Sequence, residues 1–211
     1  MGVDQSKDKS EGMCMDRHEF NNKIWDYYLV LERDFFDVER YVSVSNDNFN
    51  THSNEFAKQL MTICAEIDVV CKAACGHKGV SNAKNITDYA NTLLTRWNDF
   101  TTSSVTLVND PLFLIEPWKG WSAGNRPDWW EAYIDIKHHR IEGNNIVKAN
   151  MGNVINALAA LHILETYLYR DIVNSENPPK DNIHRPVNSN YHFKFQTWEK
   201  DIYMAYNLAL G

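Results

Sequence analysis

The sequence lacks any long hydrophobic run. No apolar stretch approaches the ~18 residues that a membrane-spanning helix needs, and the first residues contain no apolar core of a secretory signal. We therefore expect a cytoplasmic protein without a membrane partner. Basic residues are also few, since 21 Lys and Arg stand against 28 Asp and Glu, a formal net charge of −7. This balance argues against tight, sequence-blind binding to duplex DNA, which needs a broad basic surface.

Motifs for nucleotide binding and hydrolysis are absent as well. The sequence contains no P-loop, no dinucleotide-binding glycine pattern and no Gly-x-Ser-x-Gly motif. It also contains no Glu-x-x-His pair of the kind that builds a di-iron site in a helical bundle. The pair His162 and Glu165 has the reverse order and lies in an apolar segment. We expect neither a metal nor another cofactor.

Cysteine is scarce, with four residues in the chain. Without a secretory signal these cysteines are expected to be reduced thiols. Cys64, Cys71 and Cys75 share one side of a predicted helix, but the tight Cys-x-x-Cys spacing of structural zinc sites is missing. Buried cysteine behaves as a small apolar residue. Core packing is therefore favoured over a metal site formed by three thiols.

A helical period runs through most of the chain. Apolar residues recur at intervals of three and four, and capping residues or glycine stand at several segment ends. This pattern predicts helices at residues 17–42, 51–76, 85–100, 127–143, 144–173 and 193–208. We interpret residues 1–16 as a disordered leader and residues 17–211 as one domain. The predicted fold class is all-α, a bundle of five to six helices.

Aromatic residues are plentiful, with 7 Trp, 10 Tyr and 9 Phe. Four of the tryptophans fall close together, at Trp118, Trp121, Trp129 and Trp130. The first two belong to a Trp- and Pro-rich segment, residues 101–125, which we predict to be a long loop wrapped against the helices. Apolar residues flank Asn-Asp-Pro near its start, a pattern that indicates a short hairpin.

The predicted helix at 127–143 carries the densest set of candidate functional residues. Aromatic and cationic side chains share one side of it, with a histidine on the neighbouring side. Such a stripe suits a phosphate beside a stacked base. The candidate ligand-binding residues are Trp130, Tyr133, Lys137, His138 and Arg140, joined by Asn150 of the next helix. The plainer alternative, which we weigh more heavily, is a helix with core aromatics whose cations complement its C-terminal dipole.

Three asparagines in the following helix need hydrogen-bond partners. Asn150, Asn153 and Asn156 lie within seven residues of an apolar segment, although asparagine is a poor helix former. They either contact a ligand or bond between helices to set their register. The second interpretation is favoured.

The run from Pro127 to Arg140, followed by residues 153–161, resembles uncharacterised bacterial helical proteins of a HEPN-like kind. Such proteins are often associated with phage defence or toxin–antitoxin systems. Residues 31–35 and 65–68 are similar to the same group, so the resemblance covers most of residues 17–170. It implies a homodimeric helical protein that binds RNA or a nucleotide.

HEPN ribonucleases carry an arginine followed, after four to six residues, by a histidine, and this pair helps to cleave RNA at a dimer interface. Arg185 and His192 have this spacing, but Arg185 precedes Pro186 and lies in a predicted loop. His138 and Arg140 are the right residue types in the wrong order. These four residues are the weak catalytic candidates, and the resemblance implies a non-catalytic binding version of the family.

Three hypotheses follow. The leading one is a HEPN-like accessory protein that binds RNA or a nucleotide in a bacterial defence or toxin–antitoxin context. The second is a metal-independent ribonuclease, in which His138 or His192 acts as acid or base and an arginine stabilises the phosphorane charge. The third is a protein-interaction module without a small ligand, in which residues 101–125 present an apolar partner surface.

Overall fold

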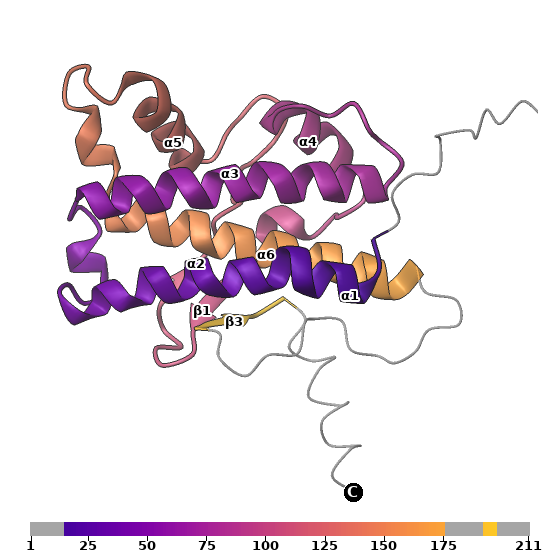
Figure 1. Ribbon diagram of the computed structural model, residues 1–211, viewed down its shortest axis with the longest axis horizontal. Coiled ribbons are helices and arrows are strands. Elements are labelled where there is room, and N and C mark those ends of the chain that lie inside the picture. Colours follow the sequence, from indigo (N-terminus) through magenta and orange to yellow (C-terminus); the bar gives the residue numbers. More distant parts are fainter. Residues whose placement is uncertain (1–14, 176–191, 198–211) are drawn as a thin grey trace, which may run out of the picture.

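The computed structural model describes residues 15–175 and 192–197 of the 211-residue chain. It is mainly helical, with one small sheet (Figure 1). The described helices and strands are α1 (Arg17–Phe20), η1 (Asn21–Trp25), α2 (Asp26–Phe36), η2 (Asp37–Arg40), η3 (Asn46–Asn48), α3 (Asn54–His77), α4 (Ile86–Leu93), η4 (Phe100–Thr102), β1 (Val105–Leu107), β2 (Leu114–Ile115), α5 (Asp128–His139), η5 (Asn145–Lys148), α6 (Met151–Ser175) and β3 (Phe193–Phe195).

The helix predicted at 17–42 is a continuous helical segment with an irregular middle. A π-helical turn, η1, joins α1 to α2, and the 3-10 turn η2 follows. Most of the leader predicted at 1–16 lies outside the described residues, as does Cys14. Asp16 caps α1, because its Oδ1 accepts the backbone N–H of Glu19 at 2.8 Å. The ordered chain therefore includes at least the end of that predicted leader.

Helix α3 begins and ends through local hydrogen bonds. The hydroxyl oxygen of Ser53 accepts the backbone N–H of Phe56 at 3.0 Å, so Ser53 is the N-cap and the helix begins a few residues after the predicted start at 51. At the other end, the N–H of Val80 donates to the carbonyl oxygen of Cys75 at 2.9 Å, and Gly79 has a φ of +80°. This is a Schellman motif with glycine in the left-handed region. The prediction that Gly76 ends the helix was wrong, because Gly76 lies within α3.

The remaining predicted helices are shorter in the structure. The helix expected at 85–100 is α4, which ends at Leu93, and that expected at 127–143 is α5, which ends at His139. The helix expected from 144 begins instead at Met151, after the 3-10 turn η5. The apolar period located these three helices. Their ends were predicted wrongly because the period continues into residues that form turns.

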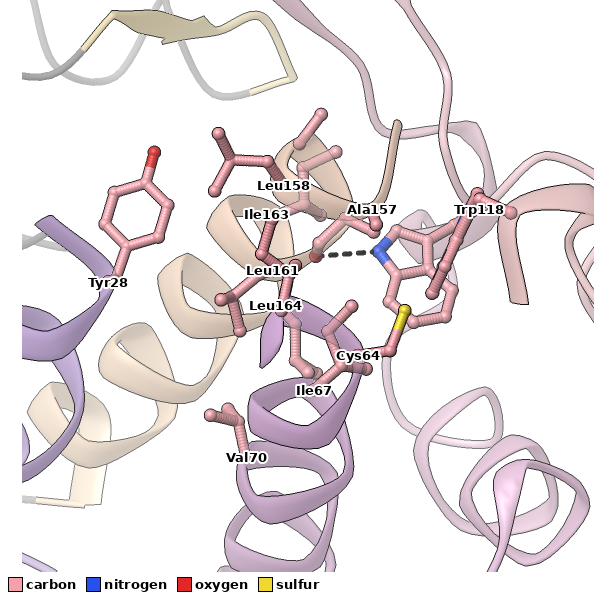
Figure 2. Close-up of a cluster of buried hydrophobic side chains, with 14 of the residues drawn as sticks. Tyr28, Cys64, Ile67, Val70, Trp118, Ala157, Leu158, Leu161, Ile163 and Leu164 are labelled. Carbon is pink, nitrogen blue, oxygen red and sulfur yellow. Dashed lines mark hydrogen bonds between the residues drawn. The ribbon is translucent and has the colours of Figure 1, made fainter. Parts of the chain in front are cut away.

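Helix α6 is the centre of the bundle. In Figure 1, α2 and α3 run antiparallel to each other in front of it, and α6 packs mainly against α3. Figure 2 shows Leu161 and Leu164 of α6 close to Ile67 of α3, with Trp118 beside them. Nearly all residues of α6 up to Tyr169 are buried, which explains why its sequence is apolar on every side. No described helix, α6 included, combines the length and apolarity that crossing a bilayer requires.

The sheet has the strand order β2-β1-β3, and both pairings are antiparallel. Strands β1 and β2 confirm the predicted hairpin. The helix predicted at 193–208 was wrong for its first residues, which form β3, and residues 198–208 lie outside the described chain. Phe193 and Phe195 are both buried with Lys194 half-buried between them, an alternation that suits a strand covering the core. The all-α prediction therefore holds for most of the described chain but not for these strands.

Candidate functional site

The aromatic half of the predicted α5 stripe belongs to the core. Trp130 and Tyr133 are buried, and their ring centroids lie 5.2 Å apart. Trp130 also meets the edge of Trp129 at 5.8 Å. Little of either ring is left to stack on a base, so these two candidates position α5 on the bundle. Nothing in their packing requires a ligand.

The cationic half of the stripe is exposed. The Nζ of Lys137 donates to the hydroxyl of Tyr133 at 3.1 Å and lies 5.3 Å from the centroid of its ring. His138 and Arg140 are exposed, and within the described chain neither side chain makes a hydrogen bond or an ion pair. His139 is also exposed and lies 3.1 Å from Glu142. We call residues 137–140 the basic turn. Its charges suit the carbonyl end of α5 and remain accessible to an anion.

Asn150 has a structural role in the start of α6. Its Oδ1 accepts the backbone N–H of Asn153 at 2.9 Å, and its Nδ2 donates to the carbonyl of Val147 at 3.1 Å. The side chain thus satisfies one of the donors that a helix start leaves unpaired. It also lies on the wall of a pocket, which is the position that a ligand contact requires.

This pocket opens between the start of α5 and the first turns of α6, and has a volume of about 430 Å³. The loop before α3 and residues 116–119 complete its walls. Its lining is Phe49, Asn50, Glu116, Lys119, Asp128, Trp129, Asn150, Gly152, Asn153 and Asn156. All three asparagines singled out in the sequence therefore face one cavity. Lys137, His138 and Arg140 are not part of this lining.

The pocket offers mainly hydrogen-bond acceptors. The side-chain nitrogen of Asn153 donates to the carbonyl of Lys148 at 2.8 Å, and that of Asn156 donates to the carbonyl of Gly152 at 2.8 Å. Their Oδ1 atoms are left as acceptors. Glu116 and Asp128 add carboxylates, and Lys119 is paired with Glu116 at 2.8 Å. Such a lining favours ligand N–H groups over phosphate.

The four clustered tryptophans link this pocket to the core. Trp118 meets Trp121 at 4.6 Å and Trp129 at 5.1 Å between ring centroids. The indole N–H of Trp129 donates to the carbonyl of Pro117 at 2.8 Å, and that of Trp118 donates to the carbonyl of Ala160 at 3.0 Å (Figure 2). Residues 101–125 therefore pack against α5 and α6 through these rings.

A second polar cluster joins α2, α6 and β3, and the sequence did not reveal it. The hydroxyl of Tyr28 donates to Glu32 Oε1 at 2.8 Å, and Nδ1 of His162 lies 3.1 Å from the same hydroxyl. The backbone N–H of His192 also donates to Glu32 Oε1, at 2.7 Å. Burial raises the pKa of Glu32, although these hydrogen bonds oppose the rise. The four-residue spacing of Tyr28 and Glu32 was visible in the sequence, whereas their partners come from distant segments.

His192, a predicted catalytic candidate, lies in this second cluster. Its ring stacks on Phe36 at 3.9 Å, and its Nδ1 lies 3.5 Å from a Glu32 oxygen. Arg185, its predicted partner, lies outside the described residues. The described contacts of His192 attach β3 to α2.

The core also buries titratable side chains that belong neither to the pocket nor to the cluster around Glu32. Both carboxylate oxygens of Glu165 are buried without a hydrogen-bond partner in the described chain. Burial, and then the charge of Glu66, raise the pKa of Glu165 well above its ordinary value. Cys64, Cys71 and Cys75 are buried, free thiols, consistent with core packing. Residues 15–175 and 192–197 contain no group of three or more His, Cys, Asp or Glu side chains placed to hold a metal ion.

Comparison of the chain with protein-family models, with curated proteins and with solved structures found no match. The functional assignment therefore depends on the geometry of the pocket and the basic turn. The basic turn ends α5, the helix that the sequence singled out, and the pocket lies between the start of α5 and α6.

Proposed function

We propose that this protein binds single-stranded RNA through α5, as a non-catalytic, HEPN-like accessory protein of a bacterial defence or toxin–antitoxin system. The observation that carries the proposal is that an exposed basic turn ends α5 and an acceptor-lined pocket lies between the start of α5 and the first turns of α6. The two features match the two parts of a nucleotide, namely the phosphate and the base.

The basic turn supplies the phosphate contacts. The side chains of Lys137, His138 and Arg140 are exposed, and none of them pairs with a carboxylate in the described chain. Cations free of internal ion pairs gain most from a phosphate, because counterions released from the nucleic acid supply the free energy. Tyr133 steadies Lys137 through its hydroxyl, which reduces the conformational freedom lost on binding.

The pocket accommodates a base. The amide oxygens of Asn153 and Asn156 face exocyclic amino groups and ring N–H groups, which are the donors on base edges. Acidic side chains at the rim disfavour a phosphate in the same place, so the base and phosphate sites are separate.

The spacing of the two features favours an oligonucleotide over a mononucleotide. Asp128 at the pocket and Lys137 in the basic turn are nine residues apart on α5, or ~13.5 Å along the helix at 1.5 Å per residue. That length corresponds to about four nucleotides at the ~3.4 Å rise that one strand has in a duplex. Nine residues are about two and a half turns, so Asp128 and Lys137 lie on opposite sides of α5. A single nucleotide contacts one feature, and a single strand that reaches both must pass around the helix.

The test measures RNA affinity by fluorescence anisotropy with a labelled single strand of about eight nucleotides, twice the span above. Lys137→Ala/Arg140→Ala is expected to weaken binding about tenfold, or ~1.4 kcal/mol, and to reduce the salt dependence. The matched control is Lys23→Ala/Lys72→Ala, which removes two exposed lysines from α1–α3.

Equal affinities for the two double variants would show that the basic turn is not the phosphate site. Gel analysis of the same RNA after incubation separates binding from cleavage. Loss of full-length RNA that depends on His138 would favour the ribonuclease hypothesis instead.

A further inference from the structure

The exposed apolar surface of the described chain gathers in more than one place. Val108, Leu112 and Leu114 are exposed on the β1–β2 hairpin, although most apolar side chains of residues 101–125 are buried. Tyr27, Val30 and Tyr41 are exposed on the segment that contains α2. Tyr41 of the second group lines a groove, which makes this group the stronger candidate for an interface.

This groove lies where η2 leaves α2 and where α3 begins, and has a volume of about 530 Å³. Its lining combines apolar and charged residues: Asp34, Asp37, Val38, Tyr41, Val42, Thr51, Ser53, Glu55, Phe56 and Lys58. We call it the α2–α3 groove. It shares the loop before α3 with the pocket at the start of α5, but no lining residue.

The apolar part of the groove is incompletely covered. Phe56 belongs to the core, whereas Val38 and Val42 are only partly buried against it. The ring of Tyr41 is 86% exposed, although it is large and partly apolar. A partner that covers this ring and fills the groove gains the hydrophobic free energy that the isolated protein leaves unused.

The charged part of the groove is acidic. Three carboxylates, Asp34, Asp37 and Glu55, stand against the single ammonium group of Lys58. Lys58 pairs with Glu55 at 2.7 Å, and Asp37 pairs with Arg40 at 3.0 Å. The Asp34 carboxylate makes no hydrogen bond or ion pair within the described chain, although its charge attracts the ammonium group of Lys58. This rim repels phosphate and attracts a cation.

The surface continues along α2. Tyr27, Val30 and Asp34 recur at intervals of three and four and so share one side of the helix. From Tyr27 to Phe36, α2 extends ~13.5 Å at 1.5 Å per residue, and the 3-10 turn η2 leads to Tyr41 over a further ~10 Å at ~2.0 Å per residue. The surface is long enough for about four turns of a second helix, which exceeds the reach of a small cation.

We propose that the α2–α3 groove docks a basic amphipathic segment of a partner protein. An apolar side chain of the segment fills the groove beside Tyr41, and a flanking lysine or arginine pairs with Asp34. This is helix-in-groove recognition with complementary charge. A second copy of this chain is a poor occupant, because a two-fold contact brings the same carboxylates together. The inference does not depend on RNA binding by α5.

The probe is a labelled amphipathic peptide of lysine and leucine, about 14 residues long to match the span from Tyr27 to Tyr41. A peptide with glutamate in place of lysine is the charge control. Each is titrated against the full-length protein by fluorescence anisotropy, and amide NMR shifts map the contact. We expect only the lysine peptide to bind and to change the amide chemical shifts of Val38, Tyr41 and Phe56.

Asp34→Lys/Tyr41→Ala is expected to weaken this binding about tenfold. The matched variant Asp47→Lys/Leu112→Ala makes the same change of charge and truncates another exposed apolar side chain outside the groove. It should bind as the unmodified protein does. All four positions are exposed, and unfolding curves establish that both variants fold.

Three results would overturn the inference. One is that the two double variants bind the lysine peptide equally well. Another is that the lysine and glutamate peptides bind equally well, or that neither binds at millimolar concentration. The third is a dimer, seen by sedimentation, that Tyr41→Ala dissociates, because the occupant is then a second copy of the chain.

Discussion

The carboxylate of Glu32 joins two parts of the chain that lie 160 positions apart. Its Oε1 accepts the backbone N–H of His192 at 2.7 Å and the hydroxyl of Tyr28 at 2.8 Å. Because Glu32 is 1% exposed, water cannot replace it as an acceptor. The contact therefore attaches β3 to the helical bundle.

Removal of this acceptor is expected to destabilise the fold. Glu32→Ala leaves the hydroxyl of Tyr28 and the N–H of His192 without their shared acceptor, at ~1–3 kcal/mol for each buried group. Glu32→Gln keeps an acceptor oxygen and should lose less. Urea unfolding followed by tryptophan fluorescence measures both variants. Glu39→Ala, an exposed neighbour, is the control, and a similar loss in all three variants would contradict the structural role of Glu32.

The buried Glu165 is expected to make stability depend on pH. Burial raises the pKa of Glu165 in the folded protein. The contribution of its protonated carboxyl group to stability is therefore fully present below the ordinary pKa of glutamate, and it is lost as the pH rises through the pKa of the folded state. The free energy of unfolding of Glu165→Gln, relative to the unmodified protein, should therefore rise by up to ~1.4 kcal/mol per pH unit above about pH 4.3.

Urea unfolding at a series of pH values measures this difference. The exposed Glu131→Gln is the control, and its difference from the unmodified protein should change little with pH. If the difference in unfolding free energy between Glu165→Gln and the unmodified protein also did not change with pH, the carboxyl group of Glu165 would have a partner in solution.

Two glycines in helices should respond to alanine in opposite directions. A Cβ on Gly152 would lie 3.1–3.2 Å from the side chain of Phe49. The backbone carbonyl of Phe49 accepts the Gly152 N–H, and its ring contacts Phe113, so Phe49 is held in place. We expect Gly152→Ala to destabilise the fold by about 1 kcal/mol or more. Gly76→Ala meets no atom within 4 Å and should stabilise α3 by ~0.5–1 kcal/mol. Thermal unfolding of both proteins tests the pair, and equal signs would be inconsistent with the packing at Phe49.

The pocket and the basic turn should affect RNA binding differently. Asn156→Ala removes an acceptor from the pocket, at ~0.5–1.5 kcal/mol for one hydrogen bond, and should leave the salt dependence unchanged. Lys137→Ala should lower the salt dependence by about 0.7 in the log–log slope for one lost phosphate contact on a single strand. Titrations at several salt concentrations measure both slopes, with the exposed Asn46→Ala as control. If Asn156→Ala changes the slope, the pocket holds phosphate.

The thiols of α3 should be unreactive in the folded protein. Burial raises the pKa of Cys64 and Cys71 well above the ordinary value and that of Cys75 to about 11. The reactive thiolate is therefore rare and shielded at neutral pH. Alkylation with iodoacetamide, read by mass spectrometry of peptides, should modify these cysteines only in urea. Rapid native modification of Cys64 would show that α3 opens locally.

The helices were predictable because their signals are local. Ser53 caps α3, and Asn85 accepts two backbone N–H groups at the start of α4, as the residue types indicated. The strand β3 was missed, although Phe-Lys-Phe alternates, because a three-residue strand has no stability without its partner β1. Pairing between residues about ninety positions apart has no local signature.

The candidate site was only partly predictable for the same reason. The sequence identified α5 and the asparagines of α6, but the aromatic side of α5 could equally face a ligand or the core. Trp130 packs against Trp129 and Tyr133 packs against Trp130, which places both in the core, while Lys137 and Arg140 stay exposed. The cluster around Glu32 required the fold, since it combines α2, α6 and β3.

The sequence by itself determined that this chain forms amphipathic helices without a membrane span among the described residues, because periodicity, caps and run lengths act over a few neighbouring residues. Tertiary structure decided which polar groups meet. Asn153 faces a pocket with Glu116, and Glu32 accepts from His192, because burial in a shared core brings distant segments within hydrogen-bonding distance.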